Sequence, residues 1–415
     1  MKQTKKLVII GNGMAGSRLL QELVKLDNEQ LSITVIGAEP GPAYNRILLS
    51  SWLSGQVSEA EMALATRDWY QRHEIRVYDN DPVIHIDCKQ KQITTYTKNV
   101  IDWDYLVLAT GSRANRLNVP GREANGVMCL RSLQDARDLH KLIRPDASAV
   151  VIGGGLLGLE AACSLADQGM SVTVVHNAGW PMNRQLDEEA GNHLADSLRL
   201  RGIRFHGDAN CSHFNTTDNG SQLASLELAD GTVLPCSIAI MALGITPEVE
   251  LAHTIELKTD RAIKVDAWLQ TSKPDIFALG ECCQIGEDVF GLVAPVYQQA
   301  RILAMVLNTC ASSYANANIR ALPCYHHQPT PTRLKVSGVD VFSAGDINTS
   351  AHNKSMIWRD AQQGHYRRLW WRDNTLQAVV MFGDVSDGNR YAQLIETQRI
   401  VASRSQEMFG LGDSA

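Results

Sequence analysis

Three glycines near the start of the chain have the spacing of a phosphate-binding turn. They are Gly11, Gly13 and Gly16 in the segment GNGMAG, and an apolar run stands directly before them. In such a turn the first glycine permits a tight bend, the second lets the backbone approach a pyrophosphate, and the third lets helix and strand pack closely. Glu39 follows the next apolar run, where it can accept hydrogen bonds from a ribose diol. The segment predicts a dinucleotide site.

The same pattern occurs a second time, in GGGLLG at residues 153–158. One glycine motif alone could end an ordinary helix, but two, each preceded by an apolar run, are far more specific. The chain is therefore expected to bind two dinucleotides. After the strand that follows the second motif, an acid would bind the 2′-hydroxyl of NADH. His176 stands there instead, and Arg184 nearby suits NADH or NADPH, so the residues leave this choice open.

Two further apolar runs end in glycines that could face a cofactor. LVLATGS at residues 106–112 ends in a turn, and TSKPDIFALGE at residues 271–281 ends in Gly280 and Glu281. A glycine followed by an acid can let the backbone close on a flavin phosphate while the acid binds a ribityl hydroxyl. A carboxylate at a strand end can also simply be solvated. Beside the first glycine motif, the ligand-binding interpretation is favoured.

The elements that must hold these residues follow from the apolar spacing. Leu7–Ile10 suits a buried parallel strand, Ser17–Lys25 has helical spacing, and Leu31–Ile36 gives the next strand. The second motif repeats this order, and the two motifs are far enough apart for one nucleotide domain to be inserted in the other. We predict an α/β fold with two Rossmann-like dinucleotide-binding domains, one inserted in the other, plus a small α+β C-terminal domain.

Composition excludes several classes of protein. The 415 residues include 44% hydrophobic and 20% charged residues, which is close to the globular average, and the net charge of −6 argues against broad nucleic-acid binding. No run approaches the length of about 18 apolar residues that a membrane span needs. The nine cysteines form no CxxC pair, which is typical of a reducing compartment. We expect a cytoplasmic protein that binds neither nucleic acid nor membrane.

The motifs GNGMAG, LVLATGS, VVIGGGLLGLE and TSKPDIFALGE together resemble those of the two-dinucleotide flavoprotein reductases. More narrowly, AYNRILLS at residues 43–50 and GLVAP at residues 291–295 look like the FAD/NAD(P)H portion of assimilatory nitrite reductase large subunits. They also look like the stand-alone reductases of assimilatory nitrate reductase and of rubredoxin. The resemblance implies FAD in the first site and NADH in the second, with NADPH left open. We place the FAD-binding domain at residues 1–116 and 246–315, the NAD(P)H-binding domain at 117–245 and a C-terminal interface domain at 320–415.

The resemblance also implies roles for single residues. Arg46 and Ser50 fall in the loop that the family uses on the FAD pyrophosphate, and a helix starting near Pro295 points its N-terminus at the flavin. Glu160 matches a glutamate near the nicotinamide and is the predicted catalytic residue, although an early glutamate also suits the helix dipole. The predicted cofactor-binding residues are Gly11, Gly13, Met14, Ala15, Gly16, Glu39, Arg46, Ser50, Val83, Ala109, Thr110, Gly111, Gly153, Gly155, Leu156, Leu157, Gly158, His176, Gly244, Gly280, Glu281, Ala294 and Pro295.

The placement of cysteines bears on the chemistry. Disulfide reductases of this fold place a CxxxxC pair in the first helix region of the FAD domain, but this chain has no cysteine from Gly11 to Arg72. Cys282 and Cys283 are neighbours, and because a disulfide between neighbours is strained, a redox role for them is disfavoured but stays open. The chain also lacks the four-cysteine spacing of the iron–sulfur cluster in a full nitrite reductase, and no metal site is predicted.

These features predict an FAD-dependent NAD(P)H oxidoreductase, the reductase component of an electron-transfer system. It would take a hydride from NAD(P)H and pass electrons to a separate redox protein of iron–sulfur, molybdenum or rubredoxin type, such as a nitrate or nitrite assimilation enzyme. The alternatives are an NADH oxidase that uses oxygen, and a flavin-dependent redox sensor or scaffold. A homodimer is left open, and the sequence does not identify the acceptor.

Arginines stand beside tryptophans near the C-terminus, in WR at residues 358–359 and YRRLWWR at residues 366–372. This composition is enriched at protein interfaces. A half-buried strand with alternate arginines in water explains it equally well. On the interface interpretation, Arg367 and Arg368 are expected to dock an acidic electron acceptor or a second subunit.

Overall fold

The computed structural model describes residues 4–26, 30–217, 220–312, 318–327, 331–336, 339–348, 354–400 and 408. The chain forms two compact units, each of which is described by itself. The first unit comprises Met1–Leu48, Val57–Arg113 and Ile245–Gln328, and the second comprises Leu49–Gln56, Ala114–Gly244 and Pro329–Ala415.

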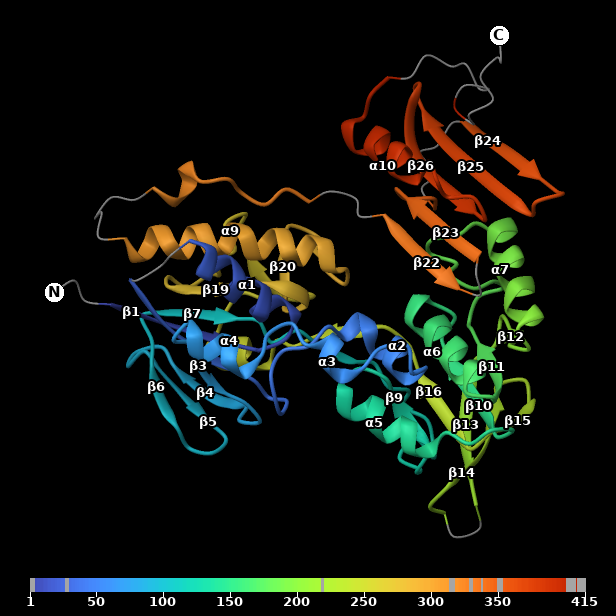
Figure 1. The fold of residues 1–415 in the computed structure, drawn as a ribbon, viewed down its shortest axis with the longest axis horizontal. Coiled ribbons are helices and arrows are strands. Elements are labelled where there is room, and N and C mark those ends of the chain that lie inside the picture. The colour runs from blue at the N-terminus through green and yellow to red at the C-terminus, as the bar shows by residue number, and fades with distance from the viewer. Residues whose placement is uncertain are drawn as a thin grey trace. The chain divides into compact units, whose positions relative to one another are not determined.

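A parallel sheet forms the centre of the first unit. Its strands, in spatial order, are β19 (Ile276–Ala278), β7 (Tyr105–Leu108), β1 (Lys5–Ile10), β2 (Leu31–Ile36) and β3 (Arg76–Tyr78). Every neighbouring pair is parallel, as in a doubly wound nucleotide-binding sheet. The helices α1 (Met14–Lys25) and α9 (Val293–Ala311) pack side by side above this sheet in Figure 1.

Smaller elements complete the first unit. A three-stranded antiparallel sheet consists of β4 (Val83–Asp87), β5 (Gln92–Thr95) and β6 (Val100–Asp102). A further three-stranded sheet contains β18 (Ile263–Val265), β20 (Cys283–Ile285) and β21 (Asp288–Val289). The remaining elements are η1 (Arg46–Leu48), α3 (Glu59–Met62), α4 (Arg67–Arg72), the pair β8 (Ser112–Ala114) and β17 (Ile245–Pro247), α8 (Glu250–Thr254), η2 (Gly280–Cys282) and η3 (Ile319–Ala321).

The second unit contains a parallel sheet with a similar strand order. Its strands, in spatial order, are β12 (Arg204–His206), β11 (Ser171–Val175), β10 (Ser148–Ile152), β16 (Ile238–Met241) and β9 (Val127–Cys129). An antiparallel sheet is built from β13 (Cys211–Thr216), β14 (Leu223–Leu228) and β15 (Val233–Pro235). The helices of this part are α2 (Leu49–Leu53), α5 (Leu133–Leu142), α6 (Leu156–Asp167) and α7 (Glu188–Leu200).

The last part of the chain, in the second unit, is an antiparallel sheet followed by a helix. The strands lie in the order β22 (Thr332–Val336), β23 (Val339–Ala344), β26 (Thr375–Phe382), β25 (His365–Arg372) and β24 (Lys354–Asp360), and α10 spans Gly388–Thr397. The predicted fold class, two Rossmann-like parts plus a small α+β C-terminal part, is therefore confirmed. The predicted residue limits of three domains stay a prediction.

The expectation that Arg367 is an exposed docking residue is wrong. Its residue surface is only 4% exposed, and its guanidinium pairs with Asp384 and, at 2.7 Å, with Asp387. Arg368 pairs with Asp187 at 2.9 Å. The physical reason is that both faces of the C-terminal sheet are covered, one packing against α10 and the other against α7. The side chains of β25 alternate between the two faces of the sheet, and protein covers them on both faces.

None of the helices in the described parts of the chain combines the length and the apolar composition that a membrane-spanning segment needs.

Candidate functional site

The first glycine motif forms a turn that only glycine fits at two positions. Gly11 has φ +117°, and a Cβ there would lie 2.1 Å from the carbonyl oxygen of Ala109, just after β7. At Gly16 a Cβ would lie 2.0 Å from the carbonyl oxygen of Gly11. Since no side chain tolerates such distances, the glycines let α1 pack directly on the backbone at the ends of β1 and β7.

The second glycine motif repeats this geometry. Gly153 has φ +118°, and a Cβ there would lie 2.3 Å from the carbonyl oxygen of Ala242, just after β16. At Gly158 a Cβ would lie 1.9 Å from the carbonyl oxygen of Gly153. The two turns, one in each unit, are therefore structurally equivalent.

The middle glycine of each motif faces open space. Apart from the glycine itself and its adjacent residues, no heavy atom of the described residues lies within 4 Å of the place where a Cβ would stand on Gly13 or on Gly155. Each is the N-cap of its helix, α1 or α6, and supplies no side-chain hydrogen bond, whereas serine, threonine or aspartate side chains cap α3, α4, α5 and α7. First-turn N–H groups left in this way bind anions such as a pyrophosphate. The predicted residues in these first turns are Met14, Ala15, Leu156 and Leu157.

Glu39 lies after β2 in a cluster with Tyr44 and Arg46. The Tyr44 hydroxyl donates to Oε2 of Glu39 over 2.7 Å, and the Arg46 guanidinium pairs with Oε1. The same guanidinium lies over the Tyr44 ring, 5.7 Å from its centroid. A carboxylate accepts about four hydrogen bonds, so these contacts leave Glu39 room for a ribose hydroxyl. The structure brings Glu39 and Arg46 together, and the sequence analysis missed Tyr44.

The residues after β7 are held by a neighbouring loop of the first unit. Ala109 donates its N–H to the carbonyl oxygen of Ile10 over 2.8 Å, which ends the pairing of β7 with β1. The Thr110 hydroxyl donates to the carbonyl oxygen of Glu248 over 2.9 Å, and the carbonyl oxygen of Gly111 accepts the Glu248 N–H over 2.9 Å. These bonds fix the backbone turn that faces the first glycine motif.

The glycine and the acid after β19 are also fixed. Gly280 has φ +87°, and Oε2 of Glu281 accepts a hydrogen bond from the Ser112 hydroxyl over 2.6 Å. Glu281 is thus oriented by its own unit before any ligand is considered.

The predicted cofactor-binding residue Val83 is the first residue of β4, and its side chain is buried.

The helix predicted to start near Pro295 begins at Val293. Its N-cap, Leu292, supplies no side-chain hydrogen bond, Ala294 is exposed and Pro295 is buried in the first turn. Proline suits this position because a first-turn N–H has no partner within the helix. The N-terminus of α9 therefore remains available to a polar or anionic group.

Two buried amide groups of the first unit each leave a donor without a partner. Oδ1 of Asn12 accepts a hydrogen bond from the Tyr70 hydroxyl over 3.0 Å, and Oε1 of Gln299 accepts the Gly280 N–H over 2.8 Å. The amide nitrogens of Asn12 and Gln299 are buried and lack a hydrogen-bond partner within the described residues. Buried donors are normally satisfied. Together with the open space at Gly13, these orphaned donors fit a cofactor such as FAD.

The predicted catalytic residue, Glu160, lies in the first part of α6. Its carboxylate has no hydrogen bond or ion pair among the residues that the structure describes. Burial raises the pKa of this carboxyl to about 7, because the charged form loses hydration without gaining a partner. Glu160 is therefore able to hold or release a proton near neutral pH.

His176 forms a hydrogen bond with the backbone of the second glycine motif. Its Nδ1 accepts the Gly154 N–H over 3.2 Å, and its Nε2 lies 3.0 Å from Oδ1 of Asn183. With Nδ1 as the acceptor of the Gly154 N–H, Nε2 is the ring nitrogen placed to donate to Oδ1 of Asn183. Both ring nitrogens are already bound by the chain. Arg184, the next residue after Asn183, is exposed.

Gly244 follows β16, two residues after the Ala242 carbonyl that the second glycine motif approaches. It has φ +82°, its carbonyl oxygen accepts the Asn115 N–H over 3.0 Å, and the Asn115 side chain donates to the carbonyl oxygen of Leu243 over 3.2 Å. The second unit thus brings together the glycine motif, Glu160, His176 and Gly244.

Ser50 is the one predicted FAD-binding residue that the first unit does not contain. It lies in α2, and its carbonyl oxygen accepts a hydrogen bond from the Ser164 hydroxyl of α6 over 2.9 Å. Its predicted contact with FAD stays a prediction.

All nine cysteines are free thiols. Cys282 and Cys283 are fully buried, and their sulfur atoms contact the carbonyl oxygens of Leu279 and Gly280 at 3.3 Å each. Burial raises the pKa of both thiols, which disfavours the reactive thiolate. The described residues also hold no cluster of three or more side chains suited to a metal ion.

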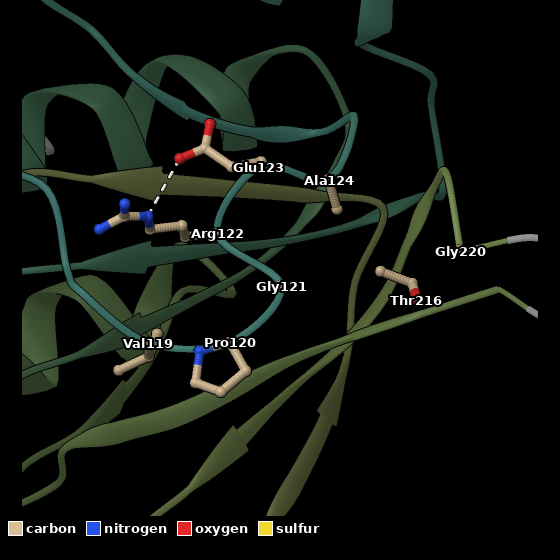
Figure 2. Close-up of a pocket in the computed structure, with 8 residues that line it drawn as sticks. All are labelled: Val119, Pro120, Gly121, Arg122, Glu123, Ala124, Thr216 and Gly220. Atoms are coloured by element: carbon tan, nitrogen blue, oxygen red, sulfur yellow. Dashed lines mark ion pairs between the residues drawn. The ribbon is translucent and has the colours of Figure 1, made fainter.

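A hollow of about 380 Å³ lies elsewhere in the second unit (Figure 2). It is lined by residues 119–124 together with Thr216 and Gly220. Figure 2 shows Arg122 paired with Glu123 at its rim, at 3.0 Å. None of the predicted site residues lines it, and we assign it no role.

Two family models match the chain. Residues 5–301 match the model of the pyridine nucleotide-disulphide oxidoreductases, and residues 331–399 match the C-terminal domain of rubredoxin NAD⁺ reductase.

Several relatives are longer than this chain. It is 36% identical over 406 residues to an assimilatory nitrate reductase electron transfer subunit and 38% identical over 402 residues to a nitrite reductase, both of Bacillus subtilis. These matches cover 97% of the chain but only 51% and 48% of the relatives, so the chain spans about half their length. It is also 28% identical to an NADH-rubredoxin oxidoreductase of Clostridium acetobutylicum, with 96% of each chain covered.

Solved structures share the fold. A covalent complex of putidaredoxin reductase with putidaredoxin matches with a TM-score of 0.86 at 23% identity, covering 99% of this chain and 96% of that one. The NADH:rubredoxin oxidoreductase of Clostridium acetobutylicum matches with a TM-score of 0.78 at 24% identity, covering 99% and 100%.

Proposed function

Because the chain belongs to the pyridine nucleotide-disulphide oxidoreductase family, we propose that it is the NADH-dependent reductase component of an electron-transfer system. It takes a hydride from the nicotinamide into FAD and passes the electrons to a separate redox protein. The observation that carries the proposal is the pair of equivalent glycine turns, each with an open middle glycine and an uncapped helix. One flavin and one nicotinamide nucleotide account for both turns.

The residues of the first unit hold FAD, which supplies, when bound, the capacity to accept a hydride and release single electrons. Gly13 and the N-terminus of α1 bind the pyrophosphate, and Glu39 binds the ribose. Glu281, oriented by Ser112, binds the ribityl chain. The N-terminus of α9 stabilises negative charge on the ring system through its dipole. Arg46 completes the pyrophosphate site in this proposal, and a contact of Ser50 with FAD stays a prediction.

The second unit binds the nicotinamide nucleotide on the N-terminus of α6. NADH is the proposed donor, as the family resemblance implies. No carboxylate stands at His176 to repel a 2′-phosphate, so NADPH is not excluded by charge. Glu160 is the proposed catalytic residue beside the nicotinamide. With a pKa of about 7 its carboxyl group would be able to hold or release a proton near neutral pH beside a bound nicotinamide.

The acceptor is a protein of iron–sulfur, molybdenum or rubredoxin type. The relatives named above are an electron transfer subunit of nitrate reductase, a nitrite reductase and an NADH-rubredoxin oxidoreductase. The C-terminal match is to the C-terminal domain of rubredoxin NAD⁺ reductase. We place the protein in the cytoplasm because its nine cysteines are all free. A homodimer is compatible with the proposal.

The test uses the purified protein, first under anaerobic conditions, where NADH is expected to bleach a bound flavin. With excess NADH, a catalytic amount of the protein is then expected to reduce rubredoxin or an iron–sulfur protein anaerobically at a higher rate than it consumes oxygen in aerated buffer. Oxygen as the faster acceptor would make the protein an NADH oxidase. A change in gel-filtration volume with NADH, without turnover of any acceptor, would make it a redox sensor.

A further inference from the structure

Gln299 links α9 to the turn after β19. Its residue surface is fully buried, and Oε1 of its side chain accepts the N–H of Gly280 over 2.8 Å. The sulfur of Cys283 lies 3.7 Å from the same oxygen. One amide oxygen thus organises the start of η2.

Gly280 needs this acceptor because it lies one residue beyond the strand pairing. The N–H of Leu279 still reaches the carbonyl oxygen of Leu108 over 3.1 Å, and the next N–H, that of Gly280, turns away from β7. A buried backbone N–H without an acceptor is costly. The turn is also confined from the other side, since a Cβ on Gly280 would lie 2.9 Å from the Cβ of Ala15 in α1.

The turn carries the acid that the proposed flavin site uses. Glu281 follows Gly280 directly, and its carboxylate is held by the Ser112 hydroxyl at 2.6 Å. Gln299 therefore fixes the backbone of Glu281 from one side while Ser112 fixes its side chain from another.

The amide nitrogen of Gln299, in contrast to its oxygen, lacks a hydrogen bond. Nε2 of Gln299 is buried and has no hydrogen-bond partner within the described residues. An orphaned buried donor is costly. A methionine of the same length would avoid that cost but would leave the Gly280 N–H without an acceptor, so the acceptor oxygen is what the glutamine supplies here.

We infer that Gln299 is a positioning residue for the flavin, acting through the Gly280–Glu281 turn. The inference rests on the proposed function, since it requires FAD in the first unit. It makes the affinity for FAD and the spectrum of the bound flavin depend on the hydrogen bond from the Gly280 N–H to Oε1 of Gln299, whichever group Nε2 meets when FAD is bound.

The test compares Gln299→Met, which removes the acceptor at nearly constant length, with Gln299→Glu, which keeps an oxygen for the Gly280 N–H. Apoprotein is titrated with FAD, and the affinity, the visible absorption spectrum and the midpoint potential are measured. The methionine variant is expected to bind FAD at least tenfold more weakly and to shift the spectrum of the flavin that it still binds, while the apoprotein still unfolds in one cooperative thermal transition. The glutamate variant is expected to recover most of the affinity at pH 6, where a buried carboxyl is neutral.

Gln298→Met, a half-buried neighbour on the same helix, is the matched control and is expected to behave as wild type. Should Gln299→Met fail to fold, Gln299→Asn takes its place, because its amide is one methylene too short to reach Gly280. A double variant with Glu281→Ala is expected to show less than the sum of the single effects.

Wild-type FAD affinity, spectrum and potential in the methionine or asparagine variant would overturn the inference. If wild-type protein itself bound no FAD, the proposed function would fail instead, so the two failures are distinguishable.

Discussion

Glu160 carries a buried carboxyl group that the described chain leaves without a partner, and its pKa is raised to about 7. An ordinary glutamate has a pKa of about 4.3, so between these values the folded state holds a proton that the unfolded state has released. The free energy of unfolding therefore falls as pH rises through this window. Glu160→Gln is expected to raise the free energy of unfolding by up to about 3 kcal/mol at pH 8 and to leave it unchanged at pH 4. Urea denaturation of the apoprotein at both pH values measures this, with exposed Glu188→Gln as the control. An equal effect at both pH values would mean that Glu160 is not desolvated.

His176 acts on the second glycine motif through Gly154 and not through a free ring nitrogen. His176→Ala removes the acceptor of the Gly154 N–H, a loss of about 1 kcal/mol for one hydrogen bond. We expect NAD⁺ to bind about five- to tenfold more weakly, with FAD content unchanged, and His176→Gln to restore part of the affinity. Isothermal titration with NAD⁺ checks this, and His206→Ala serves as the control. If the alanine variant bound NAD⁺ with wild-type affinity, the hydrogen bond from Gly154 to His176 would not support nucleotide binding.

Single residues differ in how far their roles could be predicted from the sequence. The glycines were predictable because their backbone contacts recur with the motif, and the geometry at Gly11 is repeated at Gly153. Tyr70 and Gln299 were not, since each acts on a residue far along the chain and neither stands in a recognisable local pattern. Arg367 was misjudged because alternation along a strand does not reveal whether both faces will be covered.

Among the elements, the small sheet β4–β6 depends on one carboxylate. Asp81 is 4% exposed, and it accepts hydrogen bonds from the Thr97 N–H at 2.8 Å, the Thr97 hydroxyl at 2.6 Å and the Asn99 amide at 3.0 Å. Burial alone would raise the pKa of Asp81, but these hydrogen bonds outweigh it and lower the pKa to about 2. The stability that Asp81 adds is thus present above pH 4 and is lost as pH falls towards 2.

Asp81→Ala is therefore expected to lower the free energy of unfolding by about 2–3 kcal/mol at pH 7, with a difference from wild type that shrinks as pH approaches 2. Thermal or urea unfolding across this pH range measures it. Asp68→Ala, at an exposed carboxylate of α4, is expected to change stability by less than about 0.5 kcal/mol. A loss at Asp81 that does not depend on pH would show that its charge is not what stabilises the sheet.

The elements themselves were largely predictable, and their contacts were not. The strand predicted at Leu31–Ile36 is β2 with the same limits, and the helix predicted to start near Pro295 begins two residues earlier, at Val293. The contact between the C-terminal sheet and α7 depends on tertiary pairs with no local pattern. The Tyr366 hydroxyl donates to Asp187 over 2.5 Å, and Arg359 pairs with Glu189 at 2.5 Å.

At the scale of the whole molecule, the inserted arrangement could be predicted because the strand–glycine–helix pattern occurs twice, with enough chain between the two motifs for one domain to lie within the other. The number of electrons that the molecule can store could be predicted only in part. The absence of cysteine from Gly11 to Arg72 excluded one thiol relay, but the adjacent pair at 282–283 stayed open until its burial was known.

With those two thiols buried against carbonyl oxygens and their pKa values raised, the flavin is the only electron store in the proposed function. Anaerobic titration is therefore expected to consume about one NADH per FAD, because one hydride fills the flavin. The absorbance of the flavin and the number of thiols that react with a chromogenic disulfide are followed together, and the thiol number is expected to stay constant throughout. Cys282→Ser with Cys283→Ser should titrate to the same endpoint. Consumption of a second NADH, accompanied by newly reactive thiols that the double variant lacks, would mean that the pair forms a disulfide in the oxidised protein and that electrons pass through it on their way to the acceptor.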